Sequence, residues 1–366
     1  MGIFNRVTVD LMEDVALQRG FGADGARPWG DRDIEVALSE PTPGAIDAVR
    51  QLEGDHMVLG ASGKMGVTLA AMIRRALDAA GKKGARVVGV ARFRDAGSRA
   101  ALEAFGVETV QCDLLDYEAV MGLPSAANVQ YLSGQKFGTD GAPDETWVQN
   151  TVVPSNVARR FRDSRIVVFS TGCVYPLSPT AGPGANEESP LGFLGEYATT
   201  CIGRERVFTY YSRKFGTKAL LFRLNYSVEF RYGVLADIGE QVRSGKPVDL
   251  TVSVANVIWQ RDACARAVQS LLHVESPPRK LNVTGAEKIE IKAIATKFGA
   301  VFGKEPVFRG TPQPAVWHSD SGRSIGLFGP TLVSLDTMID GVGRYLAASG
   351  RLLGKPTHFE VVDGKF

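Results

Sequence analysis

The segment HMVLGASGKMGVTLAAMIRRALDAAG, residues 56–81, constrains the fold more than any other part of the sequence. Residues 56–59 are typical of a short buried strand, and apolar residues recur at helical spacing over 67–80. Between them lies a GxxGxxG loop, whose backbone can approach a pyrophosphate while the following helix N-terminus faces it. This order predicts dinucleotide binding by the loop residues Gly60, Ser62, Gly63, Lys64, Met65 and Gly66.

Strands and helices alternate along the rest of the chain. Apolar runs in ARVVGVARF, VETVQCDLLD, NVQYLSGQKFG, SRIVVFSTGCVYP, TKALLFRLN and KLNVTG predict buried strands, with helical patterns between them. Uninterrupted apolar strands that alternate with helices are typical of a parallel sheet covered on both faces. The expected fold class is therefore α/β, a Rossmann-like doubly wound parallel sheet with a smaller C-terminal substrate domain.

Three parts of the chain are expected. Residues 1–52 form an N-terminal extension across a domain surface, with two short helices separated by Pro41 and Pro43. Residues 53–224, completed by 261–284, form the dinucleotide-binding domain. The substrate domain and tail comprise residues 225–260 and 285–366.

Composition excludes several classes of protein. The 366 residues are 44% hydrophobic and 22% charged, so the chain can bury a proper core. The net charge of +2 is spread without a basic stripe, so no nucleic-acid partner is expected. No run of about 18 apolar residues predicts a membrane span. The four cysteines and four histidines are scattered, so neither a disulfide framework nor a metal site is expected. These features predict a cytoplasmic protein, and a homodimer is left open.

The end of the second predicted strand bears on the choice of cofactor. An acidic residue there would bind the ribose 2′-hydroxyl of NAD. The sequence instead has Ala91 and Arg92, with Arg94 beyond. A guanidinium pairs well with a 2′-phosphate, so the sequence favours NADP, with NAD as the alternative.

Five motifs follow one another along the chain: GASGKMG, CDLLD, YLSGQKFG, STGCVYP and YATTCIGRE. Over about residues 55–345 the chain resembles the extended short-chain dehydrogenase/reductase superfamily, which includes NAD-dependent epimerases and dehydratases. The resemblance implies that Asp113 and Leu114 flank the adenine and that Ser133 and Gly134 lie against the cofactor. It also implies that Asn150 is the helix asparagine of the catalytic framework.

The same resemblance implies the catalytic pair. Thr171 would hydrogen-bond the substrate oxygen, and Tyr197 would act as acid and base, with Glu205 further along the same helix. The family has a lysine four residues after the tyrosine, where this chain has Cys201. A phenol with a pKa near ~10 is a poor base at neutral pH. A lysine lowers that pKa, and a neutral thiol cannot.

Three explanations of Cys201 remain open. Another cation can replace the lysine: Arg204, about two helical turns after Tyr197, or Lys136 in SGQKFG. Alternatively, the positive charge of the cofactor's nicotinamide itself lowers the pKa of Tyr197. In the third explanation catalysis is lost, and the chain is a dinucleotide-binding sensor or scaffold.

Fewer sequence features indicate which substrate the chain binds. Gly172 and Cys173 occupy the positions of the Asp-Glu pair in the family's dehydratases, so elimination is not expected. Cys173, Asn225 and His318 are the candidate substrate contacts. Segment 225–260 is short, and its arginines, which could bind a diphosphate, are Arg231 and Arg243. The expected enzyme is thus an NAD(P)-dependent oxidoreductase or epimerase of a small sugar, sugar acid or polyol. A nucleotide-sugar epimerase is the alternative.

Overall fold

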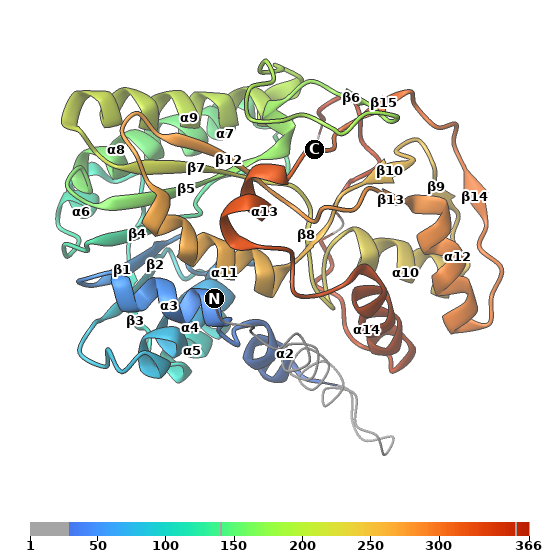
Figure 1. The fold of residues 1–366 in the computed structure, drawn as a ribbon, viewed down its shortest axis with the longest axis horizontal. Coiled ribbons are helices and arrows are strands. Elements are labelled where there is room, and N and C mark those ends of the chain that lie inside the picture. Colours follow the sequence, from blue (N-terminus) through green and yellow to red (C-terminus); the bar gives the residue numbers. More distant parts are fainter. Residues whose placement is uncertain (1–28, 140, 356, 366) are drawn as a thin grey trace, which may run out of the picture.

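Seven parallel strands form the central sheet of the computed structural model, which describes residues 29–139, 141–355 and 357–365 (Figure 1). The strand order is β12-β7-β5-β4-β1-β2-β3. The strands are β1 (His56–Leu59), β2 (Val87–Ala91), β3 (Glu108–Gln111), β4 (Asn128–Tyr131), β5 (Arg165–Thr171), β7 (Ala219–Leu224) and β12 (Arg279–Val283). The order reverses between β1 and β4, and ligands bind beyond the carboxyl ends of the strands at such a point.

Helices cover both faces of the sheet. One layer contains α3 (Pro43–Gln51), α4 (Gly66–Ala79), α5 (Ala96–Ala104) and α11 (Gln260–Ser270), which ends in η3 (Leu271–His273). The other contains α6 (Tyr117–Met121), α7 (Pro143–Trp147), η1 (Val148–Val152), α8 (Val153–Arg160) and α9 (Gly195–Phe215). Since successive strand residues point to opposite faces, Val58 packs into the first layer and Met57 into the second. The predicted doubly wound α/β fold is confirmed.

A smaller lobe stands beside the sheet (Figure 1). Its helices α10 (Val234–Ser244), α12 (Ile291–Phe302) and α14 (Leu335–Ala347) pack against one another. Its core buries Phe230, Trp259 and Phe298. Short elements complete the lobe and its junction with the sheet: η2 (Gly172–Val174), β6 (Ser178–Pro179), β8 (Ser227–Val228), β9 (Val248–Asp249), β10 (Val254–Ala255), β11 (Ile258–Trp259), β13 (Ile289–Glu290), β14 (Phe308–Arg309), β15 (Ala315–Val316) and α13 (Gly322–Phe328).

The N-terminal extension contains the two predicted helices, α2 (Asp31–Leu38) and α3. Thr42 caps α3 by accepting a hydrogen bond from the Ala45 amide at 3.2 Å, and Pro43 occupies the first turn. Ile34 of α2 is buried in the core of the smaller lobe, whereas Ala45 is buried against the sheet. The described part of the extension therefore belongs to both cores, instead of lying across a surface as expected. Residues 1–28 lie outside the described residues.

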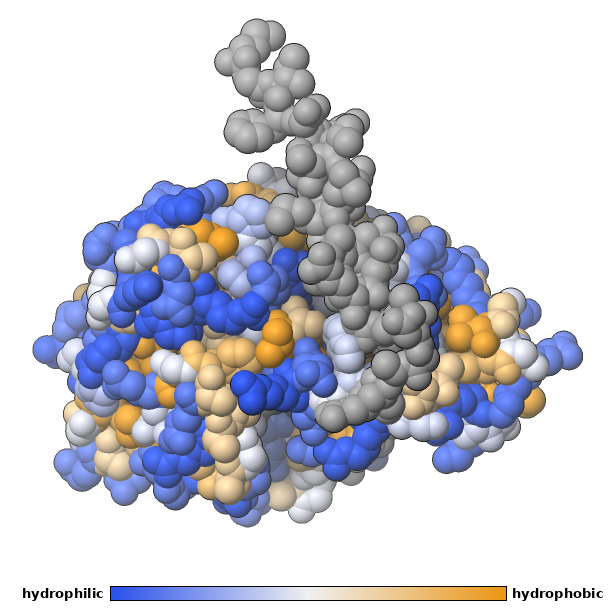
Figure 2. All heavy atoms as spheres, turned by 90° about the horizontal axis from the view of Figure 1, so that it is seen from below, coloured by the Kyte–Doolittle hydropathy of each residue, from blue (hydrophilic) through white to orange (hydrophobic). Residues whose placement is uncertain are grey.

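Polar side chains cover most of the face shown in Figure 2, with apolar side chains in small groups between them. Among the described residues, no helix is both long enough and apolar enough to cross a membrane.

Candidate active site

A cavity of about 780 Å³ lies where strands of the central sheet end. Its wall includes Gly60 after β1, Gly134 after β4, Thr171 at the end of β5 and Leu224 at the end of β7. Because all these strands are parallel, their carboxyl ends meet at one edge of the sheet. The fold thus gathers residues that are far apart in the sequence around one space.

The glycine loop forms one wall of this cavity, through Gly60, Ser62, Gly63, Lys64, Met65 and Gly66. Gly60 has a φ of +92°, and a Cβ there would lie 2.9 Å from the Ser133 amide nitrogen. A Cβ on Gly66 would lie 2.5 Å from the Ala61 carbonyl oxygen. Helix α4 starts directly after the loop without a side-chain cap, which leaves its first amide groups available to an anion. This backbone cradle fits the pyrophosphate of a dinucleotide.

Gly63→Val is expected to abolish dinucleotide binding while the melting temperature changes little. A Cβ on Gly63 meets only the Gly60 carbonyl oxygen, at 3.2 Å, so the larger side chain projects into the cavity. Calorimetric titration with dinucleotide, paired with thermal melting, measures both quantities. The contrasting variant is Gly66→Ala, whose methyl group collides with backbone and should lower the melting temperature. Unchanged affinity in Gly63→Val would contradict the assignment of the loop.

Tyr197 lies in the first turn of α9, with its ring between Cys173 and Cys201. Its hydroxyl is hydrogen-bonded to the side chain of Thr171 and to the thiol of Cys201. Thr171 Oγ1 also accepts a hydrogen bond from the Cys173 amide at 3.2 Å. The end of β5 and the start of α9 thus bring the predicted catalytic threonine and tyrosine into contact.

The surroundings of Tyr197 work against its ionisation. Burial raises the pKa of Tyr197 well above its ordinary value, and the Cys201 and Cys173 thiols act in the same direction. The positive charge of Arg204 and the hydrogen bond with Thr171 lower it. Burial also raises the pKa of Cys201 to about 11, so residue 201 is a neutral thiol at neutral pH.

The positive charge of Arg204 lowers the pKa of both Tyr197 and Cys201. Its guanidinium is buried, donates to the Phe169 carbonyl oxygen at 2.9 Å and also donates to Asn150 Oδ1. Asn150, in η1, also accepts from the Gln135 amide at 3.0 Å and donates to Thr200 Oγ1 at 2.9 Å. The asparagine therefore ties the loop after β4 to α9 and sets the position of Arg204.

Lys136, in that same loop, is half-buried and lines the cavity. Its Nζ donates to the Thr357 carbonyl oxygen at 3.4 Å. Burial lowers the pKa of Lys136, while Cys173 opposes that shift. Both cations that the sequence offered as substitutes for the missing lysine are thus present at the cavity.

Glu205 does not line the cavity, and its carboxylate is engaged in a buried network of hydrogen bonds. Its carboxylate accepts two hydrogen bonds from Arg223, at 2.9 and 2.6 Å, and one from Ser170 at 2.6 Å. Arg223 in turn donates to the Tyr175 hydroxyl at 2.7 Å, which donates to Asn282 Oδ1 at 2.7 Å. This chain of contacts joins α9 to β7 and β12 behind the active site.

The predicted adenine-side residues do not line the cavity. Arg92 is exposed just after β2. Asp113 is exposed, and its Oδ1 accepts a hydrogen bond from the Leu115 amide at 3.0 Å. Leu114 is buried in the core under α8, and Ser133 packs against the glycine loop. Gly134 does line the cavity, close to Arg204.

Of the predicted substrate-contact residues, two line the cavity and one does not. Cys173 and Asn225 line the cavity, and Asn225 Nδ2 is buried without a partner among the described residues. His318 is buried outside it, with Nε2 3.0 Å from the Pro179 carbonyl oxygen. This contact lies beside the pairing of β6 with β15.

Further residues of the cavity wall were not anticipated from the sequence: Phe137, Tyr232, Gln260, Lys355, Thr357 and His358. The tail reaches the cavity because Asp237 of α10 accepts hydrogen bonds from the Thr357 amide at 2.8 Å and from its hydroxyl at 2.6 Å. No motif or periodicity in GKPTHFEVVDGKF marks this contact.

Several solved structures with the same fold are epimerases. The UDP-glucuronic acid 4-epimerase from Bacillus cereus, in complex with NAD, is 18% identical with a TM-score of 0.65, over 80% of this chain and 98% of that chain. The UDP-glucose 4-epimerase from Thermus thermophilus, also with NAD, is 20% identical with a TM-score of 0.66, over 80% and 99%. An epimerase from Methanothermobacter thermautotrophicus is 15% identical with a TM-score of 0.68, over 84% and 96%.

At these identities the structural likeness establishes the fold. A search of curated proteins finds no match. The sequence model of the NAD dependent epimerase/dehydratase family matches residues 56–262, which is more than half of the chain. That segment contains the glycine loop, Thr171 and Tyr197. The chain therefore belongs to the NAD dependent epimerase/dehydratase family, an enzyme family of the extended short-chain dehydrogenase/reductase type.

Proposed function

We propose that this chain is an NAD-dependent epimerase that inverts a carbinol carbon of a nucleotide sugar. The observation that carries the proposal is the hydrogen bond between Thr171 and Tyr197 in the cavity that the glycine loop also lines. The similar solved structures include 4-epimerases of UDP-glucose and UDP-glucuronic acid. They support a nucleotide sugar more than the small free carbohydrate favoured by the sequence.

Each residue has a role that its contacts support. NAD bound in the cavity would supply the hydride acceptor and donor for the carbinol carbon. The Tyr197 hydroxyl exchanges the proton of the substrate hydroxyl, and Thr171 orients the same oxygen. Asn225 Nδ2, which has no partner among the described residues, is a donor for a further substrate oxygen.

Arg204 takes over part of the role of the missing lysine in this proposal. Its guanidinium is fixed by the Phe169 carbonyl and by Asn150, and its charge lowers the pKa of Tyr197. A buried, hydrogen-bonded guanidinium keeps its charge at any physiological pH. Lys136, which lines the same cavity, adds a second positive charge.

NAD is the proposed cofactor, although the sequence favoured NADP. The family description and two of the similar structures name NAD, and Arg92 is exposed outside the cavity wall.

Arg92→Ala is therefore expected to bind NAD with the same affinity as wild type, and both proteins are expected to prefer NAD to NADP. Calorimetric titration of both proteins with NAD and NADP measures this. Tighter NADP binding that Arg92→Ala weakens about tenfold or more would establish the opposite choice.

The test of the function begins with mass spectrometry of the purified protein to identify any retained dinucleotide. The protein is then incubated with UDP-glucose, UDP-galactose and UDP-glucuronic acid, and with the matching free sugars, sugar acids and polyols. Nuclear magnetic resonance is expected to detect inversion of a carbinol centre in a nucleotide sugar alone. Turnover of only the free carbohydrates would overturn the proposed substrate class.

A non-catalytic dinucleotide-binding protein is the second candidate. The raised pKa of Tyr197 and the neutral thiol of Cys201 favour it. It predicts that cofactor binds but that no compound of the panel causes transient reduction of the nicotinamide in stopped-flow absorbance. Any substrate-dependent reduction excludes this candidate.

A further inference from the structure

The charges on the cavity wall have one sign. Among the described residues that line it, four have basic side chains, namely Lys64, Lys136, Arg204 and Lys355, and none is an aspartate or glutamate. A concave site lined by charges of one sign raises the local concentration of ligands with the opposite charge. The cavity is therefore built for an anion beyond what a neutral sugar presents.

We propose that Lys64 and Lys355 bind a phosphate group of the substrate and form its anion subsite. The inference rests on the proposed function and adds the residues that select its substrate class. Arg204 is not assigned to this subsite, because Asn150 and the Phe169 carbonyl hold its guanidinium where its charge acts on Tyr197.

The arginines that the sequence offered for a diphosphate are engaged elsewhere. Arg231 pairs with three carboxylates, those of Asp31, Glu35 and Glu229. Arg243 pairs with Glu240 on its own helix. Neither arginine lines the cavity. Recognition of a phosphate in this cavity must therefore come from other cations.

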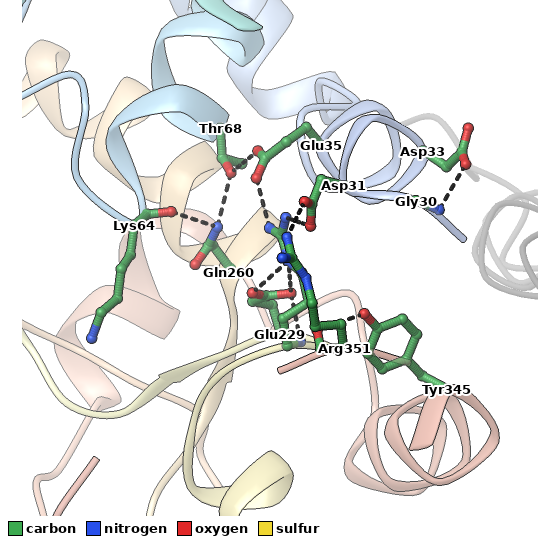
Figure 3. Close-up of polar contacts among 11 residues, drawn as sticks. Gly30, Asp31, Asp33, Glu35, Lys64, Thr68, Glu229, Gln260, Tyr345 and Arg351 are labelled. Atoms are coloured by element: carbon green, nitrogen blue, oxygen red, sulfur yellow. Dashed lines mark hydrogen bonds and ion pairs between the residues drawn. The ribbon is translucent and has the colours of Figure 1, made fainter. Parts of the chain in front are cut away.

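The network around Arg231 also fixes the backbone from which Lys64 extends. Glu35 accepts a hydrogen bond from Thr68 at 2.7 Å, and Gln260 donates to Thr68 at 2.8 Å and to the Lys64 carbonyl oxygen at 3.4 Å. Figure 3 shows these contacts, with the ammonium end of Lys64 pointing away from them. The side chain is thus anchored at its base and directed out of the network.

Two aromatic rings position the ammonium group. Lys64 Nζ lies 3.5 Å from the ring centre of Tyr232 and 4.5 Å from that of Phe137. Among the described residues, neither Lys64 nor Lys355 forms an ion pair. Burial, Lys136 and Lys355 lower the pKa of Lys64 to about 7, and the nearby Asp237 carboxylate partly opposes this shift. A bound anion would relieve this repulsion.

The cofactor's own pyrophosphate is expected at the loop backbone and the uncapped start of α4, apart from the two lysine ammonium groups. Lys355 is an exposed residue of the tail that follows the smaller lobe, and it lines the cavity. The two lysines therefore provide positive charge in addition to that backbone site. A substrate with its own phosphate groups is the ligand that uses it.

The experiment titrates NAD-saturated protein with UDP and, separately, with inorganic pyrophosphate in a calorimeter. Lys64→Met and Lys355→Met keep the length and packing of the side chain but remove its charge. Each is expected to weaken both probes by about 10- to 100-fold, the range of a charge-assisted hydrogen bond. The matched control is Lys83→Met, at an exposed position away from the cavity, which should bind both probes like wild type.

A second arm titrates cofactor-free protein with NAD, because the dinucleotide also carries phosphates. Variants that lose NAD affinity but keep affinity for UDP and pyrophosphate would overturn the inference, as would variants that bind every ligand like wild type. The proposed function can fail independently of the subsite. If UDP binding depends on Lys64 and Lys355 but no nucleotide sugar is turned over, the anion subsite stands and the epimerase activity is refuted.

Discussion

Tyr197→Phe is expected to reduce turnover by about 100- to 10,000-fold, the usual contribution of a positioned acid or base. The phenyl ring still packs between Cys173 and Cys201, so the fold and the cavity shape are retained. Only the hydroxyl that contacts Thr171 is lost. The measurement is kcat of both proteins on the nucleotide sugar identified in the panel, with NAD affinity determined alongside.

The control for this variant is Tyr210→Phe, on the same helix but with an exposed ring, which should retain full activity. If Tyr197→Phe turns over at the wild-type rate, the tyrosine does not carry the proton. If both kcat and NAD affinity fall together, the hydroxyl supports the shape of the cavity and not the reaction. Loss of kcat with unchanged NAD affinity is the result that the proposed mechanism requires.

Arg223→Met is expected to destabilise the protein by about 3–5 kcal/mol, because it leaves a buried carboxylate without its partner. Arg223 and Glu205 are almost fully buried, and the guanidinium also donates to Tyr175. Methionine fills a similar volume but supplies no hydrogen bond. Chemical denaturation at fixed pH measures the change in the free energy of unfolding.

The double variant Arg223→Met/Glu205→Gln is the informative comparison, since it removes both charges. It should recover part of the lost stability, which attributes the loss to the unpaired carboxylate and not to packing. Breaking the exposed pair of Arg50 and Asp47 should have little effect. A small effect of Arg223→Met alone would mean that water reaches Glu205.

Local sequence patterns predicted the sheet and the position of the glycine loop between β1 and α4. The strands are uninterrupted apolar runs, and the glycines at 60 and 66 stand where any side chain would strike backbone. Thr171 and Tyr197 could be placed because the order of motifs fixes which strand and helix carry them. The resemblance to the extended short-chain dehydrogenases was confirmed by the family match over residues 56–262.

The partners of the charged residues could not be read in the same way. Arg231 was considered for a diphosphate, yet it pairs with Asp31 and Glu35 of a helix nearly 200 positions earlier. His318 was placed near substrate, yet its ring bonds to Pro179. In each case the side chain type is informative, but its use depends on what the folded chain brings against it.

The sequence by itself determined the α/β architecture, the glycine loop between β1 and α4, and the strand and helix that carry Thr171 and Tyr197, because these follow from periodicity and short motifs that act within one or two elements. Only the tertiary structure decided what surrounds Tyr197: a buried Arg204 held by Asn150, a neutral Cys201 and a cavity wall with Lys64 and Lys355. The electrostatic potential at one site and its degree of burial depend on residues from every part of the chain. Those distances exist only after folding, when Lys355 in the tail comes to share a cavity with a loop almost 300 residues before it.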